Sequence, residues 1–255
     1  AADIRSGLAQ YRLLDTTRSY AAALLAQTDE GPALQRRHAL LMRELMRTAT
    51  SDSGELTVPA WNARYAHRLD DVRSALDACL AQPDDWETGA ELAIASAPLW
   101  FHVSQVEEYR DWVIAALACL AQQPGAGTET EAWLQIALGN ALWHTRGPVP
   151  EMGAAYDRAL AVAMSASSVV LELQARWGIC VLHAIRGEYA AALHHSQVLF
   201  EFAQSTPDPA ALNLAHRMTA LASHFCGDFS AASAGAQAAI LVGSTVRQTP
   251  VNLFQ

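Results

Sequence analysis

Side chains able to do chemistry occur throughout this chain, but their spacing matches no catalytic pattern. All 17 basic residues are Arg, and Lys is absent. A P-loop lysine, a Schiff-base lysine and a Ser–Lys dyad are therefore excluded. The GxSxG sequence of a nucleophile elbow is also missing. We expect a protein that is not an enzyme, binds no ATP and needs no cofactor.

The nine histidines do not show the spacing of metal ligands. His194 and His195 are adjacent, so on a helix their side chains diverge by about 100°. His216 and His224 lie two helical turns apart, and no HExxH sequence occurs. We expect these histidines to be solvated or to lie at the edge of the core, with no bound metal.

Acidic residues occur in three adjacent pairs. Asp84–Asp85 precedes a predicted helix, so we interpret it as N-cap and helix-dipole charge. The pairs Asp70–Asp71 and Glu107–Glu108 are typical of solvated helix faces. General acid–base catalysis needs carboxylates that converge from different elements, and nothing in this spacing indicates convergence.

The four cysteines are Cys79, Cys119, Cys180 and Cys226, each among apolar neighbours. No CxxC pair exists, so a zinc ribbon is not supported. We expect buried, reduced thiols that pack as small hydrophobic side chains.

Basic side chains gather on one predicted helix face, at Arg36, Arg37, Arg43 and Arg47. A DNA or phosphate contact is one interpretation of this face. Docking on an attached module, or simple solvation, is the interpretation that we favour. Residues 1–73 hold ten Arg against nine acids, whereas residues 74–255 hold seven Arg against 17 acids. A segment with a balance of −10 repels a phosphate backbone, so we expect no direct contact with nucleic acid.

Helical periodicity positions nearly all of these side chains. Apolar residues recur at spacings of three and four over 59–82 and again over 105–122. Turn-forming segments rich in Gly, Pro, Ser and Asp separate such stretches, which gives roughly eleven helices and no convincing strand. No apolar run reaches the ~18 residues that span a membrane, so we expect a cytoplasmic protein with no membrane contact.

A repeat of 40 residues orders the second half of the chain. Gly147, Gly187 and Gly227 recur at that period, and so do Val149, Tyr189 and Phe229 two positions later. A third column is Leu160, Phe200 and Ile240, and Ser165 and Ser205 also match. Each Gly would end a helix in the left-handed conformation, and the aromatic residue would plug the gap between two helices. A weaker copy spans 99–117, with Ser104 at the position of the Gly.

A fixed period with one helical hairpin per unit predicts an α-solenoid. The pattern of small residues and aromatics resembles tetratricopeptide (TPR) repeats. The period exceeds the usual ~34 residues of that family, so we expect helices that are about one turn longer. The predicted fold is all-α, a TPR-like right-handed superhelix of helical hairpins.

The first helix of each hairpin would line the concave surface. Three residues before each Gly stand His144, Ala184 and His224, and ten residues before it stand Ala137, Trp177 and Arg217. Four of these side chains have the size or polarity to contact a ligand or peptide. The candidate binding residues are therefore His144, Trp177, Arg217 and His224.

Four further phrases stand out: YRLLDTTRSYA (11–21), RRHA (36–39), LDDVRSALDACLA (69–81) and LW followed by EEYRDWVIAAL (99–100 and 107–117). In their order and spacing they resemble bacterial STAND-type ATPase transcriptional regulators, which join winged-helix, nucleotide-binding and TPR regions. In the third phrase, Asp71 replaces the usual Asn and Cys79 stands near the usual Trp. No catalytic motif of that family falls in this chain, so the resemblance transfers no functional residue.

The resemblance implies two regions and a regulatory function. Residues 1–50 would be the end of a winged-helix-like module with a linking helix, and residues 51–255 the TPR-like repeat region. The segment would bind a protein partner or small-molecule effector and control attached ATPase and DNA-binding domains. The alternative is a TPR-like scaffold or self-association domain without a small-molecule ligand.

Overall fold

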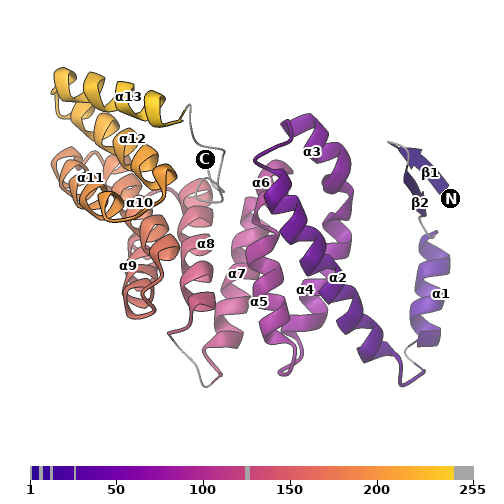
Figure 1. Ribbon diagram of the computed structural model, residues 1–255. Helices are drawn as coiled ribbons and strands as arrows, with labels where there is room; N and C mark the ends of the chain where they lie inside the picture. Colours follow the sequence, from indigo (N-terminus) through magenta and orange to yellow (C-terminus); the bar gives the residue numbers. More distant parts are fainter. Residues whose placement is uncertain (1, 6–7, 12–13, 26, 124–126, 244–255) are drawn as a thin grey trace.

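The computed structural model describes residues 2–5, 8–11, 14–25, 27–123 and 127–243 (Figure 1). Nearly all of this part is helical, as the periodicity predicts. The helices are α1 (Asp15–Leu25), α2 (Gly31–Asp52), α3 (Val58–Tyr65), the short 3₁₀ helix η1 (Ala66–Arg68), α4 (Leu69–Leu80), α5 (Trp86–Ala95), α6 (Ala97–His102), α7 (Val106–Leu120), α8 (Glu129–Arg146), α9 (Pro150–Ser165), α10 (Val169–Ile185), α11 (Tyr189–Gln204), α12 (Pro209–Phe225) and α13 (Phe229–Gly243).

The expectation of no strand is wrong at the N-terminus. Strands β1 (Ala2–Arg5) and β2 (Leu8–Tyr11) pair antiparallel, with Ala2 opposite Tyr11. Each strand is only four residues long, too short for the alternation of side chains to stand out from noise. Figure 1 shows the hairpin and α1 standing apart from the stacked helices.

Figure 1 shows the helices from α2 to α13 packed side by side, and their contacts sort most of them into two layers. The first layer holds α2, α5 with α6, α8, α10 and α12, and successive members pack against one another. The second layer holds α4, α7, α9, α11 and α13, each packed on the first-layer helix before it in the stack. This order of antiparallel pairs is the solenoid that the repeat predicts.

The 40-residue period is visible in the helix bounds. Helices α8, α10 and α12 begin at Glu129, Val169 and Pro209. Each contains 17 or 18 residues, and its partner contains 15 or 16. The long helices account for the long period.

The turn column adopts the predicted left-handed backbone. The φ angles are 74° at Gly147, 75° at Gly187 and 84° at Gly227. Ser104 takes the same conformation, with φ of 58°, which places it in the glycine column. At Gly187 and Gly227 the next residue donates its N–H five residues back, from Glu188 to His183 at 2.9 Å and from Asp228 to Ser223 at 3.0 Å. These bonds satisfy carbonyls that a helix end would leave free.

The predicted aromatic plugs are only partly present. Tyr189 is half-buried, and its ring stacks on Phe225 with centroids 4.8 Å apart. Phe229 is 66% exposed, so the prediction that it lies buried between helices is wrong. Phe229 opens the last described helix, and no later hairpin covers it within the described residues.

A buried tyrosine, Tyr156, contacts two neighbouring helices at the centre of the stack. Tyr156 of α9 is fully buried, and its hydroxyl donates to Asn140 Oδ1 at 2.7 Å. Its ring lies against Gly139 of α8 and Gly178 of α10, where a Cβ at either glycine would overlap the ring. Glycine in these helices therefore makes room for a ring that contacts two neighbouring first-layer helices.

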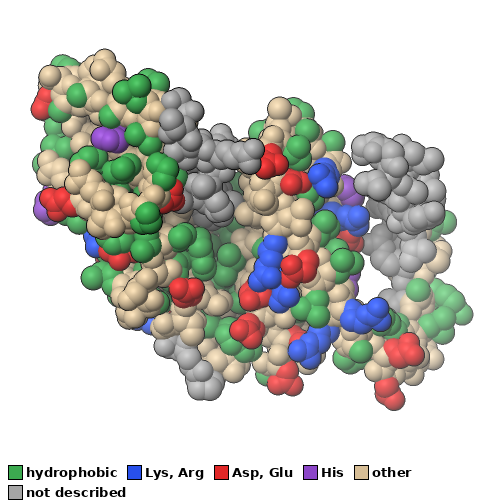
Figure 2. All heavy atoms as spheres, in the orientation of Figure 1, with side chains coloured by type: hydrophobic (Ala, Val, Ile, Leu, Met, Phe, Trp, Pro, Cys, Tyr) green, Lys and Arg blue, Asp and Glu red, His purple; other side chains and the backbone are tan. Residues whose placement is uncertain are grey.

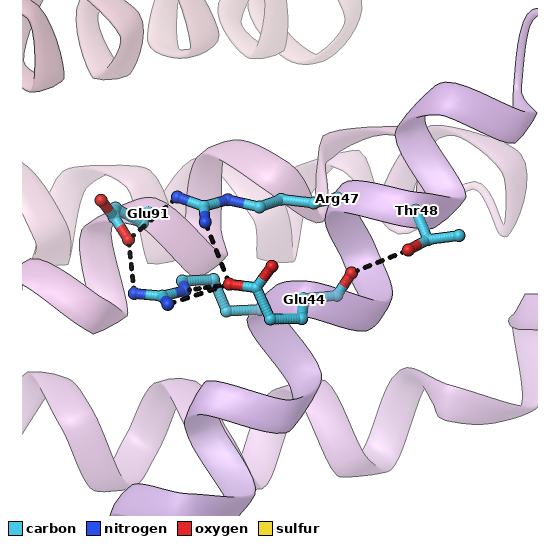
Figure 3. A network of polar contacts seen from close by, with 5 residues as sticks. Glu44, Arg47, Thr48 and Glu91 are labelled. Atoms are coloured by element: carbon cyan, nitrogen blue, oxygen red, sulfur yellow. Dashed lines mark hydrogen bonds and ion pairs between the residues drawn. The ribbon is translucent and has the colours of Figure 1, made fainter.

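The N-terminal end of the stack is held by polar contacts as well as by packing. Trp61 donates its indole N–H to the carbonyl of Ala49 at 2.7 Å, which joins α3 to α2. Arg43 and Arg47 of α2 both pair with Glu91 of α5, at 2.7 and 3.2 Å, and Figure 3 shows Arg47 between Glu91 and Glu44. The pKa of Arg43 is raised, because hydrogen bonds and charges of Glu44 and Glu91 outweigh the opposing effect of burial.

These contacts correct the interpretation of the basic helix face. Arg43 and Arg47 form ion pairs within the stack, and Arg36 pairs with Asp85 at 3.0 Å. Asp85 does occupy the N-cap position of α5, but its side chain makes no capping hydrogen bond. Figure 2 shows the resulting mixture of basic and acidic side chains over α2 and α5.

Candidate interaction surface

The C-terminal ends of the first-layer helices lie along one edge of the stack, beside the left-handed turns. The residues just before each turn are aromatic or histidine in several hairpins. We call the connected set Phe101, Trp143, His144 and Trp177 the aromatic row. Phe101, Trp143 and His144 lie near the C-terminal ends of α6 and α8, whereas Trp177 lies at the middle of α10, which packs on α8.

Ring contacts connect the aromatic row without a break. The ring of Phe101 meets His144 edge-on with centroids 4.9 Å apart, and His144 lies 4.9 Å from Trp143. Trp143 then meets Trp177 at 6.1 Å. Such edge-on geometry favours aromatic pairs, because the positive ring edge faces the negative ring face. The contacts hold the rings in a semi-rigid arrangement in which His144 is exposed, Phe101 and Trp143 are half-buried and Trp177 belongs to the core.

The four predicted site residues differ in accessibility. Trp177 is only 5% exposed and packs beneath Trp143, whereas His144 is exposed and its ring nitrogen lies 2.9 Å from the carbonyl oxygen of Asn140. Arg217 and His224 are exposed on α12. The structure thus links His144 to Trp177 through Trp143, and it places Arg217 and His224 on the far side of α10.

A second group of apolar side chains lies at the turns of the last two hairpins. We call Ile185, Tyr189, His224, Phe225 and Phe229 the turn patch. Ile185, Phe225 and Phe229 are exposed, and the His224 ring contacts both Phe225 and Phe229, at 5.4 and 5.5 Å. Tyr189 and Phe225 bridge the two hairpins by stacking. The patch is continuous across two repeats.

Histidines and an acid border the turn patch. His183 Nδ1 lies 2.6 Å from Glu188 Oε2, and the His183 ring stacks on His195 with centroids 4.7 Å apart. The pKa of His195 is lowered by burial and by the neighbouring His183 and His194. His195 is therefore neutral near pH 7, and the charged side chains of the Gly187 turn are Arg186 and Glu188.

A cavity of about 330 Å³ lies between the start of α2 and the end of α4. Its lining includes Arg36, Cys79 and Asp85, and the Arg36–Asp85 ion pair spans part of it. Burial and the nearby Asp85 raise the pKa of the Cys79 thiol to about 11, so this thiol is protonated and unreactive near pH 7. Among the described residues that line this cavity, no nucleophile is paired with a base.

Over the residues that the structure describes, no group of three or more His, Cys, Asp or Glu side chains could hold a metal ion. Asp70 and Glu108, one acid from each of two adjacent pairs, accept hydrogen bonds from Arg73. The Arg73 guanidinium lowers the pKa of Glu108. Within the same part of the chain, no helix is long and apolar enough to cross a membrane.

Sequence reasoning missed the residues that join the surface together. Phe101, Trp143 and Phe225 stand three, four and two residues before their left-handed turns, next to the positions selected from the sequence. A search of every position within four residues of the turn column would find them. The sequence search followed single repeat columns and did not consider the whole last turn of each helix, where several neighbouring positions lie at the same edge of the stack.

Comparisons with known proteins identify the fold and no closer relationship. No family model and no curated protein matches the chain. The crystal structure of BtubC (BKLC) from P. vanneervenii is similar, with a TM-score of 0.60 and 16% identity over 87% of this chain and 91% of that one. A putative kinesin light chain from Podosopora anserina with nearly identical TPR-like repeats also has a TM-score of 0.60, with 15% identity over 84% of this chain and 99% of that one. The chain thus has an all-α, TPR-like repeat fold, as predicted.

Proposed function

We propose that this chain is a protein-interaction scaffold that binds an extended or helical segment of a partner along its aromatic row and turn patch. The observation that carries the proposal is the connected set of rings Phe101, His144 and Trp143, which are exposed or half-buried and rest on the core residue Trp177. Aromatic side chains are enriched among residues that dominate protein interfaces, because they bury much area with little loss of conformational freedom.

The arrangement of the stack supports this proposal. A solenoid presents one long edge on which each hairpin adds a similar element, which suits a linear partner better than a compact ligand. An enzyme would need a nucleophile paired with a base in a cleft, and the described residues that line the cavity beside Cys79 hold no such pair.

Selection of binding peptides from a random display library tests the proposal. Peptides selected on the parent chain should bind Trp143→Ala clearly more weakly, because Trp143 is half-buried and connects His144 to Trp177. Removing an interface hot spot typically costs ~2 kcal/mol, or about 30-fold in affinity. Tyr20→Ala is the control, since Tyr20 is exposed on α1, away from this edge. Equal binding by both variants, with unchanged melting, would contradict the proposal.

The sensor of a STAND-type regulator is a second candidate, and the N-terminal region favours it. The β1–β2 hairpin and α1 stand apart from the stack, and Leu14, Tyr20 and Leu24 are exposed there. A two-stranded hairpin is at best marginally stable alone, so this region suits contact with another folded module. The proposed boundary between residues 50 and 51 and the attached ATPase belong to this second candidate. Sequencing upstream of the codon for residue 1 tests it, because a regulator of this type needs GxxxxGK[ST] there.

A further inference from the structure

We propose that the turn patch binds a partner segment that carries Arg or Lys side chains beside apolar ones. This inference rests on the proposed scaffold function and names the chemistry of the partner. The patch spans the turns after α10 and α12, where the sequence repeats as Gly187-Glu188-Tyr189 and Gly227-Asp228-Phe229. Each turn therefore offers a carboxylate directly beside an aromatic ring.

The exposed rings provide the first attraction for a cation. Phe225 is 48% exposed and Phe229 is 66% exposed, so both have ring surface open to a partner. A guanidinium or ammonium group over an aromatic face is attracted by the ring quadrupole. The Tyr189–Phe225 stack and the contacts of His224 hold these rings in place before binding, so little side-chain freedom is lost.

The carboxylates of the two turns provide the second attraction. Helices α11 and α13 begin at Tyr189 and Phe229, close to where α10 and α12 end, so the dipoles of the four helices largely offset one another at the patch. The negative charge at the turns therefore comes from Glu188, whose Oε2 lies 2.6 Å from His183 Nδ1, and from Asp228. Asp228 uses Oδ1 to accept a hydrogen bond from Ala231 N at 2.9 Å, which fixes its carboxylate at the start of α13.

One cation lies next to the Gly187 turn. It belongs to Arg186, whose Nε donates to the carbonyl of Pro148 at 3.1 Å, so its guanidinium is directed toward the preceding hairpin and its charge offsets only part of the negative charge of this region. Residues 74–255 hold seven Arg against 17 acids. The field of this region therefore attracts basic segments and repels acidic ones.

The exposed apolar side chains near these charges indicate that the partner segment also carries apolar side chains. Ile185, Phe225 and Phe229 are exposed at these turns, and a purely polar basic chain would leave their apolar surface uncovered. A segment in which Arg or Lys alternates with Leu-like residues covers the rings and reaches both carboxylates. A second copy of this chain is a poorer occupant, because the like charges of two patches would face each other.

Calorimetric titration with a short peptide that alternates Arg and Leu tests the proposal on the full chain. A peptide that alternates Glu and Leu is the control of opposite charge. We expect measurable binding of the Arg peptide only, with affinity falling several-fold when salt is raised from about 0.05 to about 0.3 M. Equal binding of both peptides, or binding that salt leaves unchanged, would overturn the proposal.

Conservative variants assign the binding to the patch. Phe225→Leu and Phe229→Leu keep apolar area but remove the ring, so each should weaken the Arg peptide by roughly 2- to 5-fold. Tyr20→Leu is the matched control at a similarly exposed ring on α1. Because Phe225 also stacks on Tyr189, the more exposed Phe229 is the decisive position if Phe225→Leu melts early.

Charge variants complete the test. Glu188→Gln with Asp228→Asn should weaken binding and flatten its salt dependence, and Asn retains the capping ability of Asp. Glu201→Gln, on an exposed position of α11, is the matched control and should bind like the parent. Concentration-dependent dimers that Phe229→Leu abolishes would overturn the proposal in favour of self-association. Library peptides that need Trp143 but ignore all turn-patch variants would refute this inference while leaving the scaffold function in place.

Discussion

Gly178→Ala probes the tightest packing in the stack. Helical glycine is normally the poorer residue, and Ala in its place stabilises an exposed helix by about 1 kcal/mol. Here the added Cβ would overlap the ring of Tyr156, which already lies against Gly139 on its other side. The ring cannot move without leaving its hydrogen bond to Asn140, so the substitution must separate α9 from α10 or displace Tyr156.

The expected magnitude combines three opposing contributions. Overpacking a well-filled core costs about 1–3 kcal/mol, and losing the buried Tyr156–Asn140 hydrogen bond costs about 1 kcal/mol more. The gain in helix propensity offsets about 1 kcal/mol. We therefore expect a net loss of about 2 kcal/mol, which for a domain of this size lowers the melting temperature by about 4–8 °C.

A double-mutant cycle with Tyr156→Ala separates the clash from the propensity. In that background the ring is gone, so Gly178→Ala should stabilise the chain by up to about 1 kcal/mol. Urea unfolding followed by far-ultraviolet circular dichroism measures all four chains. Equal effects of Gly178→Ala in both backgrounds would refute the claim that this glycine exists to admit the Tyr156 ring.

Three further predictions concern the turns, the thiols and acid stability. Gly187→Val and Gly227→Val should each lower the free energy of unfolding by at least ~1–2 kcal/mol, because a β-branched residue resists positive φ. Gly153→Ala should change it by no more than about 0.5 kcal/mol, since the close neighbour of the new Cβ is the flexible end of the Leu182 side chain. Thermal melts that rank Gly153→Ala as the least stable variant would contradict the repeat register. Cys226 should react first with a thiol reagent at pH 8, because its thiol is exposed, whereas burial raises the pKa of Cys79 to about 11 and that of Cys180 to about 12. Mass spectrometry after brief labelling identifies the modified cysteine. Modification of Cys180 before Cys226 would contradict the burial of the Cys180 thiol. Arg158 lowers the pKa of Glu131 below its ordinary 4.5, so this carboxylate stabilises the fold above pH 4.5 and loses its contribution as the pH falls through the lowered value. Glu131→Gln should cost roughly 1 kcal/mol at pH 7 and progressively less as the pH is lowered below 4.5, and a cost that stays constant across this range in urea titrations would show that the ion pair is inert.

The architecture was predictable because the repeat appears directly in the sequence. The column of Gly147, Gly187 and Gly227 fixed the turn positions, and Ser104 joined the same column despite its different side chain. Serine at positive φ costs more than glycine, so a rule that accepts only glycine misses such a turn. Ser167, with φ of 54° between α9 and α10, is a turn of this kind that the glycine column does not reveal.

The candidate surface was only partly predictable, because burial of a repeat position depends on the hairpin stacked after it. Tyr189 has a later hairpin to pack against, whereas Phe229, its equivalent one period later, has none among the described residues. Both stand at the same repeat position, so no local pattern separates them. Similarly, Arg43 and Arg47 looked available for a partner, and only the packing of α2 on α5 brings Glu91 to them.

The unequal burial along the stack predicts the order in which its hairpins unfold locally. In α13 only Ala239 is buried, whereas α8 buries residues along nearly its whole length. Each hairpin of a solenoid is stabilised mainly by its nearest neighbours, so local unfolding starts at the terminal hairpin with the least buried area and proceeds to the next hairpin inward. The backbone amides of α13 would exchange their hydrogens first, and those of α12 next, with α8 among the slowest. The turn patch lies on this fast-opening end, so a segment bound there would also slow the local unfolding of the last hairpin.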